Sequence, residues 1–326
     1  MTSAPLISVL MPAYNHGRYV EAAVRSVLAQ DWPRVELLAV DDGSSDDTWE
    51  KLQSLRPECE ARCERVEMWR QENRGTCATL NRLLAAARGE FVGVLASDDM
   101  YLPGAFAVLA GALVADPSVG LAVGQNQLVD GDGRRCYWDA ERNTVYDESK
   151  AAFRTLNEHM ASERGVSGDS PAFGTYAGLL HTNHVANGAL MRRACIDRIE
   201  PCSPRTPLED WWIMLQLSKV TRMKSIDVPT FAYRWHASNT VRQSARMEEY
   251  FYRNLAAEEE LLVRTRDWPH LMQMLSVYGQ LWSSAGVPWV LRRRRFVTHE
   301  SRITLFDILG MTFGRRRASR KEAKGK

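Results

Sequence analysis

The first 125 residues alternate short apolar runs with longer stretches in which apolar residues recur every three or four positions. Runs of this length and composition predict buried strands, at residues 7–10, 36–40, 66–69, 91–96 and 119–123. The stretches between them predict helices, at residues 20–28, 48–55 and 76–88 and from Pro103 onward. Because strands that alternate with helices favour parallel pairing, we expect an α/β fold with a mostly parallel central sheet and helices on both faces.

The pattern is less regular beyond residue 130. The sequence VDGDGRR predicts a turn, and the pattern predicts a helix at residues 150–160. Residues 163–178 contain Gly, Ser and Pro and predict a loop that could close over a bound ligand. Further helices are predicted at residues 208–217 and 248–264. We therefore expect one large domain over residues 1–240, followed by a helical extension over residues 241–326.

Two pairs of acidic residues directly follow predicted strands. Asp41 and Asp42 come after the second run, and Asp98 and Asp99 come after the fourth. Ligands of open α/β sheets collect beyond the carboxyl ends of strands, so this placement favours a binding site. Taken singly, each motif is also compatible with a polar turn or a solvated loop before a capped helix.

Composition and charge narrow the class of protein. With 45% hydrophobic and 25% charged residues, the chain is typical of an ordinary globular protein. Its six cysteines are scattered without zinc-site spacing, and its first residues lack the features of a signal peptide, so we expect a reduced, cytoplasmic setting. The net charge of +2 is unevenly distributed, because residues 292–326 hold twelve Lys or Arg against three acids. The basic character therefore belongs to this tail.

Several motifs, in order, carry a resemblance to a known family. The segments MPAYN, VDDGSSDDT, ASDD, LEDWW and YRWHASNT resemble the successive motifs of the family 2 inverting glycosyltransferases with the GT-A fold, of the bacterial surface-polysaccharide type. The resemblance is strong over residues 5–124, partial over residues 180–240 and absent beyond about residue 265. It implies a nucleotide-sugar-binding half over residues 1–125 and an acceptor and catalytic half over residues 126–240.

By this resemblance the donor is a UDP-sugar, with a dTDP-sugar as the second choice. Asp42, with Asp41 beside it, is similar to the family's acid that accepts a hydrogen bond from the ring N–H of uracil. The resemblance places further nucleotide contacts at Pro12, Tyr14, Asn15 and Arg74.

A diphosphate beside carboxylates implies a bridging cation, so we expect Mn²⁺ or Mg²⁺ as cofactor. By resemblance Asp99 is the direct metal ligand, and Asp98 contacts the ribose or a metal-bound water. The sequence Ala-Ser-Asp-Asp departs from the family's usual Asp-x-Asp, which leaves the division of roles between the two acids open. His236 would ligate the metal or bond the diphosphate, and Arg234 would neutralise the phosphates as the leaving group departs.

The acceptor side is expected around the start of the helix predicted at residues 208–217. By resemblance Asp210 is the base that takes the proton from the acceptor hydroxyl, and Glu209 is its positioning partner. Trp211 would contribute an acceptor platform, and Asn187 and Gly188 would line the acceptor side. The simpler alternative makes Glu209 and Asp210 first-turn acids that the helix dipole favours.

The resemblance predicts a metal-dependent inverting glycosyltransferase that moves a sugar to a saccharide or lipid-linked glycan acceptor in polysaccharide biosynthesis. The basic tail, which also carries apolar residues, would suit a peripheral position on an anionic membrane surface at the inner face of the cell membrane, whereas nucleic acid is not an expected partner. Two alternatives remain. A sugar nucleotidyltransferase lacks support because no Gly-rich triphosphate loop follows the first strand. A catalytically inactive GT-A-like scaffold subunit is the non-enzyme alternative.

Overall fold

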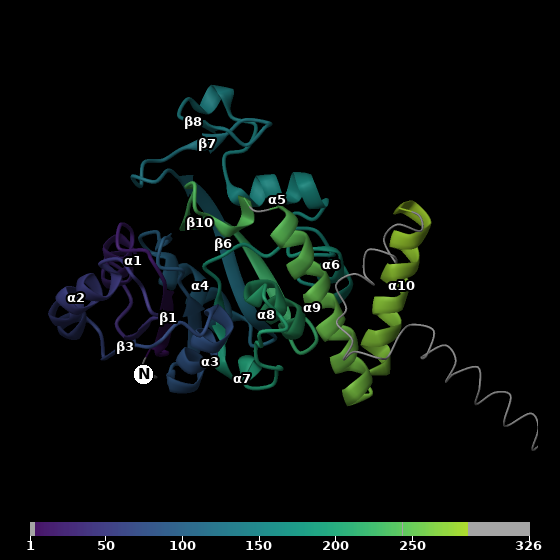
Figure 1. Cartoon of the computed structure of the whole chain (residues 1–326), viewed down its shortest axis with the longest axis horizontal. Coiled ribbons are helices and arrows are strands. Elements are labelled where there is room, and N and C mark those ends of the chain that lie inside the picture. The colour runs from purple at the N-terminus through teal and green to yellow at the C-terminus, as the bar shows by residue number, and fades with distance from the viewer. Residues whose placement is uncertain (1–3, 243, 286–326) are drawn as a thin grey trace, which may run out of the picture. The chain divides into compact units, whose positions relative to one another are not determined.

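The computed structural model describes residues 4–242 and 244–285. These residues divide into two compact units, one ending at Met247 and the other beginning at Glu248. The first unit is built on an eight-stranded sheet flanked by helices (Figure 1). Its strands, in the order β3-β2-β1-β4-β9-β6-β10-β5, are β1 (Ile7–Ala13), β2 (Val35–Asp41), β3 (Arg65–Arg70), β4 (Phe91–Val94), β5 (Met100–Tyr101), β6 (Val119–Val129), β9 (Leu190–Arg192) and β10 (Arg222–Arg234).

The strand directions confirm the predicted mostly parallel sheet. β3, β2, β1 and β4 form parallel pairs, as do β6 and β10. β9 runs antiparallel between β4 and β6, and β5 runs antiparallel at the edge beside β10. The short strand β9, which the sequence pattern did not predict, therefore joins the two halves of the sheet.

Helices cover both faces of this sheet. They are α1 (Val20–Leu28), α2 (Thr48–Arg62), α3 (Thr76–Ala86), α4 (Ala105–Ala115), α5 (Leu156–Arg164), α6 (Tyr176–His181), α7 (Arg193–Ile196) and α8 (Glu209–Leu217). Val9 and Met11 of β1 join one buried cluster with residues of α1, α2 and α4. Because successive side chains of a strand point to opposite faces, Leu10 is buried on the other face, where α3 packs against β1 and β2.

A small hairpin lies near the ends of β6 and β10 (Figure 1). It consists of β7 (Tyr137–Trp138) and β8 (Thr144–Val145), followed by a 3-10 turn, η1 (Glu148–Lys150). Trp138 of the hairpin packs into a second buried cluster with Leu128 of β6, Tyr233 of β10 and Trp235. This cluster fixes the hairpin to the carboxyl ends of β6 and β10.

Three predicted helix boundaries differ from the observed ones. α2 passes through Pro57 and reaches Arg62, because its buried face continues as far as Cys59. The helix predicted from Pro103 begins at Ala105, after Gly104 adopts φ +77°. The helix predicted at residues 150–160 begins at Leu156, because the side chain of Thr155 accepts the Glu158 N–H and caps it there. The predicted loop at residues 163–178 ends in α6, which Thr175 caps.

The second unit contains most of α9 (Ser244–Thr265) and α10 (Trp268–Ala285). It confirms a helical extension in the described residues. The buried side chains of α10 lie three residues apart, at Leu271, Met274 and Val277. Within the described part of the chain, no helix is both long and apolar enough to span a bilayer. The basic tail at residues 292–326, and the membrane contact expected of it, lie outside the described residues.

Candidate active site

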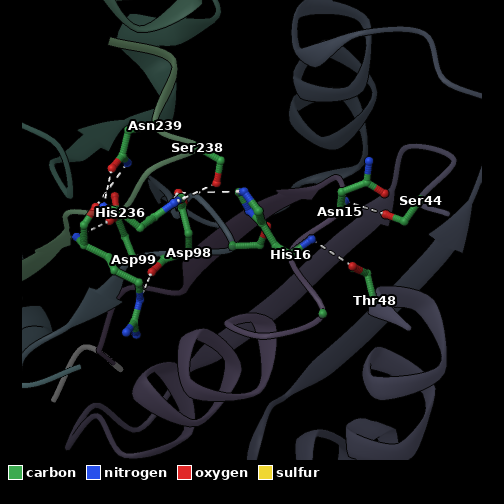
Figure 2. Close-up of polar contacts among 12 residues, drawn as sticks. Asn15, His16, Ser44, Thr48, Asp98, Asp99, His236, Ser238 and Asn239 are labelled. Carbon is green, nitrogen blue, oxygen red and sulfur yellow. Dashed lines mark hydrogen bonds and ion pairs between the residues drawn. The ribbon is translucent and has the colours of Figure 1, made fainter. Parts of the chain in front are cut away.

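The two acids that follow β4 have different surroundings (Figure 2). The Oδ2 atom of Asp98 lies 3.0 Å from Nε2 of His236 and 3.8 Å from Nε2 of His16. The Oδ1 atom of Asp99 instead accepts the backbone N–H of Arg234 at 2.8 Å, and this residue is only 2% exposed. Asp98 therefore faces two imidazoles, whereas Asp99 ties its loop to the end of β10.

These surroundings separate the pKa values of the two acids. Burial raises the pKa of Asp98, but the hydrogen bond with His236 and the nearby His16 outweigh it, so the net shift is downward. Burial and then the charge of Asp98 raise the pKa of Asp99 well above its usual range, against the opposing effects of Arg234 and the Asn187 side chain. In the free protein the pKa of Asp98 is therefore lowered and that of Asp99 is raised, so Asp98 is the stronger acid of the pair.

One carboxyl oxygen of Asp99 is used by the Arg234 backbone N–H, and the role of Asp99 as the direct metal ligand stays a prediction. A metal ligand must be deprotonated, and the lowered pKa of Asp98 favours that form beside His236. Carboxylate oxygen and imidazole nitrogen suit Mn²⁺, and such ions take further ligands from substrate phosphates. In the ranges that the structure describes, no three His, Cys, Asp or Glu side chains form a metal-binding group. The residues present therefore fit a cation held by Asp98 and His236 together with a bound diphosphate.

His16 belongs to this cluster, and the sequence analysis missed it. Its Nδ1 lies 2.8 Å from Oγ of Ser97, and its backbone N–H donates to Oγ1 of Thr48 at 2.9 Å (Figure 2). Burial lowers its pKa, with the charge of Asp98 acting in the opposite direction. The sequence signal that could have found it is its position directly after MPAYN, at the end of the first strand.

Arg234 is placed differently from the sequence expectation. Its guanidinium is 3% exposed, lies over the ring of Tyr19 at 5.0 Å, and donates to the carbonyl oxygens of Asp98, Asp130 and Gly131. These acceptors use Nε and Nη1, while Nη2 donates to the sulfur of Met100. Arg234 therefore holds together the loops around Asp98, and its role toward the phosphates stays a prediction.

The chain between His236 and Asn239 is ordered by side-chain hydrogen bonds (Figure 2). Nδ1 of His236 lies 2.8 Å from Oγ of Ser238, and its backbone N–H donates to Oδ1 of Asn239 at 2.6 Å. The Tyr19 ring lies 4.8 Å from the imidazole of His236. These contacts direct Nε2 of His236 toward Asp98.

The MPAYN loop meets the loop that follows β2. Asn15, at φ +53°, donates its backbone N–H to Oγ of Ser44 at 2.9 Å and accepts the backbone N–H of Ser45 on its side chain (Figure 2). Tyr14 is 48% exposed and Pro12 is half-buried, so both are accessible to a ligand. This placement is compatible with the expected contacts to a base.

The first acid pair is largely occupied by protein contacts. Asp41 is fully buried and pairs with Arg70 at 3.1 Å, so the structure does not support it as a nucleotide contact. Asp42 accepts hydrogen bonds from the Gln71 side chain at 2.7 Å and from the backbone N–H groups of Arg74 and Gly75, each at 2.9 Å. Asp42 therefore positions the loop before α3, on which the exposed Arg74 side chain lies.

Glu209 and Asp210 open α8, as predicted, and both have raised pKa values. Water reaches the Asp210 carboxyl, but dense protein around it removes much of its hydration and raises its pKa. The Trp211 backbone N–H at 2.6 Å and the Asn183 side chain at 3.2 Å donate to Asp210 and favour its ionised form. Burial, followed by the charge of Asp210, raises the pKa of Glu209 to about 8. The raised pKa of Glu209 keeps its proton at neutral pH, while the two donors at Asp210 favour the ionised form of that carboxyl.

Three residues expected on the acceptor side are placed elsewhere. Trp211 is 2% exposed, and its indole N–H donates to the Leu179 carbonyl at 2.7 Å, so it belongs to the core and forms no acceptor platform. Asn187 lies beside Asp99. Gly188 is buried at φ +78°, where an added Cβ would lie 2.2 Å from the ring of Phe231, so it serves close packing.

Tyr233 connects the two acidic centres electrostatically. Burial raises its pKa, and the charges of Asp99, Asp98 and Asp210 raise it further, while Arg142 acts in the opposite direction. The Asp98–Asp99 loop and Asp210 therefore lie within electrostatic range of one side chain.

Comparison with known proteins decides the class of this site. The family described as Glycosyl transferase family 2 matches residues 8–173, about half of the chain. The chain belongs to glycosyltransferase family 2. An uncharacterized glycosyltransferase of Nostoc sp. is 25% identical over 73% of this chain and 67% of its own length. The putative teichuronic acid biosynthesis glycosyltransferase TuaG of Bacillus subtilis is 40% identical over 30% of this chain and 37% of its own length.

The other relatives are matched over parts of their length. Chondroitin synthase of Escherichia coli is 34% identical, but the match spans only 18% of that protein and 40% of this glycosyltransferase. Among solved structures, S. aureus TarS 1-349 in complex with UDP-GlcNAc has a TM-score of 0.58 and 16% identity over 88% of this chain and 78% of that chain. The Pyrobaculum calidifontis mannosyltransferase PcManGT, in complex with GDP-Man and Mn²⁺, has a TM-score of 0.55 and 17% identity over 89% and 79%. These likenesses confirm the GT-A fold.

Proposed function

We propose that this glycosyltransferase is metal-dependent and inverting, and that it moves a sugar from a UDP-sugar, with a dTDP-sugar as second choice, to a saccharide or lipid-linked glycan acceptor in polysaccharide biosynthesis. The nucleotide choice is supported by the UDP-GlcNAc complex of TarS, and the metal by the Mn²⁺ complex of PcManGT. The polysaccharide role is supported by the similarity to TuaG and to chondroitin synthase.

The donor side is assigned to the cluster around Asp98. Asp98 and His236 would hold the cation, which when bound offsets the negative charge that develops on the departing diphosphate. The loops that carry Asn15 and Arg74 would hold the nucleoside, with Asp42 fixing the second loop in place. His16 is the additional group that faces the diphosphate in this assignment.

The observation that carries the catalytic proposal is the contrast between Asp210 and Glu209. Asp210 is accessible to solvent, accepts two hydrogen bonds that favour its ionised form, and is more basic than an ordinary aspartate, as a general base requires. The acceptor hydroxyl oxygen attacks the anomeric carbon as the bond from that carbon to the phosphate oxygen breaks, and the hydroxyl proton passes to Asp210. A single displacement of this kind inverts the anomeric configuration and forms no covalent sugar–enzyme intermediate.

Calorimetric titration of UDP, GDP, CDP and dTDP, each with and without Mn²⁺, tests the donor assignment. We expect UDP to bind most tightly, to require Mn²⁺, and to lose at least tenfold in affinity in Asp98→Ala. Arg154→Ala, which removes an exposed arginine paired with Glu148, is the matched control. Absence of nucleotide binding by the folded protein in either condition would contradict the proposed function, and preference for another nucleotide would contradict the UDP assignment.

A further inference from the structure

Arg142 lies at the turn of the β7–β8 hairpin, and no described residue forms an ion pair with its guanidinium. It adopts φ +65°, and Asp139 holds the turn by accepting the backbone N–H groups of Glu141 and Asn143. The guanidinium lies 5.0 Å from the ring of Trp138 and 4.9 Å from the ring of Trp235. Throughout the described ranges no acid pairs with Arg142, and its buried Nε has no hydrogen-bond partner. Stacking on two rings fixes the guanidinium plane while its N–H edge stays available to an anion.

Arg164 is a second arginine that forms no ion pair with a described residue. It is the last residue of α5, directly before Gly165, and its exposed side chain has no acid in ion-pair contact within residues 4–242 and 244–285. Water reaches the Arg164 side chain, but dense protein around it removes part of its hydration and lowers its pKa. The nearby acids Asp210 and Glu163 raise this pKa, and the positive charge of Arg142 lowers it. The two guanidinium groups are therefore close enough to repel each other.

The buried His159 lies beside both arginines. Its ring packs 5.2 Å from the ring of Trp138, on which Arg142 also stacks. Burial lowers the pKa of His159, and Arg142 and Arg164 lower it further, while Glu163 opposes them. Two like charges held beside a neutral imidazole are unfavourable in the free protein, and a bound anion would relieve this repulsion.

The arginine pair lies on the side of the catalytic base. The charges that act most on Asp98 are those of His16 and His236, and Arg234 acts on Asp99. Arg164, by contrast, acts on Asp210. An anion at Arg164 would therefore sit next to the base, and Arg142, which lies on the ring of Trp235, would hold it from the side of His236.

We propose that Arg142 and Arg164 form an anion site for the acceptor, so that the acceptor carries a carboxylate or a phosphate group close to the hydroxyl that receives the sugar. The planar N–H edges of two arginines match the geometry of either group. This inference rests on the proposed function, because it takes Asp210 as the base. It adds that the enzyme selects anionic saccharides or phosphate-bearing polyols over neutral ones.

The test measures the binding of two matched pairs of small probes by ligand-observed NMR in the presence of UDP and the diamagnetic ion Mg²⁺. The pairs are methyl glucuronide against methyl glucoside, and glycerol 3-phosphate against glycerol. We expect at least one anionic probe to bind at least tenfold more tightly than its neutral partner. The pair that shows the difference identifies a carboxylate or a phosphate as the preferred group.

The variants are chosen to preserve the fold. Arg142→Asn removes the charge with a residue that tolerates positive φ, and Arg164→Gln removes the second charge from a helix end. Each should reduce the anion preference to within twofold, whereas Arg154→Ala, the paired arginine used above as control, should keep it. Arg142→Lys retains the charge without the planar fork and should show an intermediate preference, which provides a second reading if Arg142→Asn fails to fold.

Three results would overturn the inference. They are equal binding of the anionic and neutral probes, an anion preference that persists in both Arg142→Asn and Arg164→Gln, and a tenfold loss of UDP affinity in Arg142→Asn. The last result would place the arginines on the donor diphosphate. Failure of UDP to bind the unmodified protein would instead count against the proposed function. The probe preference is then measured without nucleotide, so that failure of the proposed function and failure of the anion site are distinguishable.

Discussion

Replacing Glu209 by Gln tests whether this carboxyl is held protonated beside an ionised Asp210. Burial and the charge of Asp210 raise the pKa of Glu209 from 4.5 to about 8. A folded-state pKa above the unfolded value means that the folded protein keeps a proton that the unfolded chain releases. The stabilising contribution is therefore complete below pH 4.5 and is lost as the pH rises toward 8.

The two pKa values set the size of the effect. Their separation corresponds to a ceiling of about 5 kcal/mol, at about 1.4 kcal/mol for each pKa unit. Part of this free energy is shared with Asp210, because the pair can exchange one proton. A further part is lost below pH 5.5, outside the range measured. We expect wild-type stability to fall by about 2 kcal/mol between pH 5.5 and 8.5 through this group alone. Gln keeps the shape of the protonated carboxyl, so Glu209→Gln removes this decrease.

Urea unfolding followed by tryptophan fluorescence measures the difference between the variant and the wild type at pH 5.5, 7 and 8.5. The difference in unfolding free energy should shift by about 2 kcal/mol in favour of Glu209→Gln over this range, while other titrating groups cancel. The exposed Glu72, changed to Gln, controls for the loss of one acid. A difference that stays constant with pH would refute the assignment of the proton to Glu209.

Three further predictions concern single carboxylates. Asp210→Asn should lower the transfer rate by about 1,000-fold in a UDP-release assay while UDP affinity stays within about threefold, because the base acts only in the chemical step; a parallel loss of UDP binding would contradict this role. Asp98→Asn should abolish the Mn²⁺-dependent gain in UDP affinity measured by calorimetry, and an unchanged gain would exclude Asp98 as a ligand. Glu36→Gln should lower the unfolding free energy by about 3 kcal/mol. The reason is that the fully buried carboxylate of Glu36 pairs with Arg65 at 2.9 Å and accepts hydrogen bonds from the Ser8 hydroxyl and the Arg88 backbone N–H. A loss below about 1 kcal/mol in urea unfolding would contradict this prediction.

The sequence predicted the helices and strands whose own residues carry a clear apolar pattern. The helix expected at residues 20–28 is observed at Val20–Leu28, because its apolar positions recur along one face that packs into the core. β9 could not be predicted in this way, since it has three residues and exists through its pairing with β4 and β6. The late start of α5 depends on one capping side chain, Thr155, within a polar stretch that offers several candidates.

In the candidate site too, some features follow from the local sequence and others depend on residues that are distant along the chain. The placement of Asp98 and Asp210 in one region follows from their positions at the ends of predicted elements. One neighbour does not follow, because His16, which lies 3.8 Å from Asp98 beside the expected His236, is remote along the chain. Residue type alone did not show that Arg234 and Trp211, whose groups often meet ligands, donate here to backbone carbonyls. Only the structure shows where each donor is used.

The position of β9 also sets the shortest fragment that can fold independently. The match to the family ends at residue 173, yet β9 fills the space between β4 and β6, and β10 covers the next edge. A fragment ending at residue 173 would expose the unpaired edges of β4 and β6 to other chains, and it would invite aggregation. The region that matches the family is therefore shorter than the region needed to complete the sheet. A soluble truncated form must extend at least through Arg234.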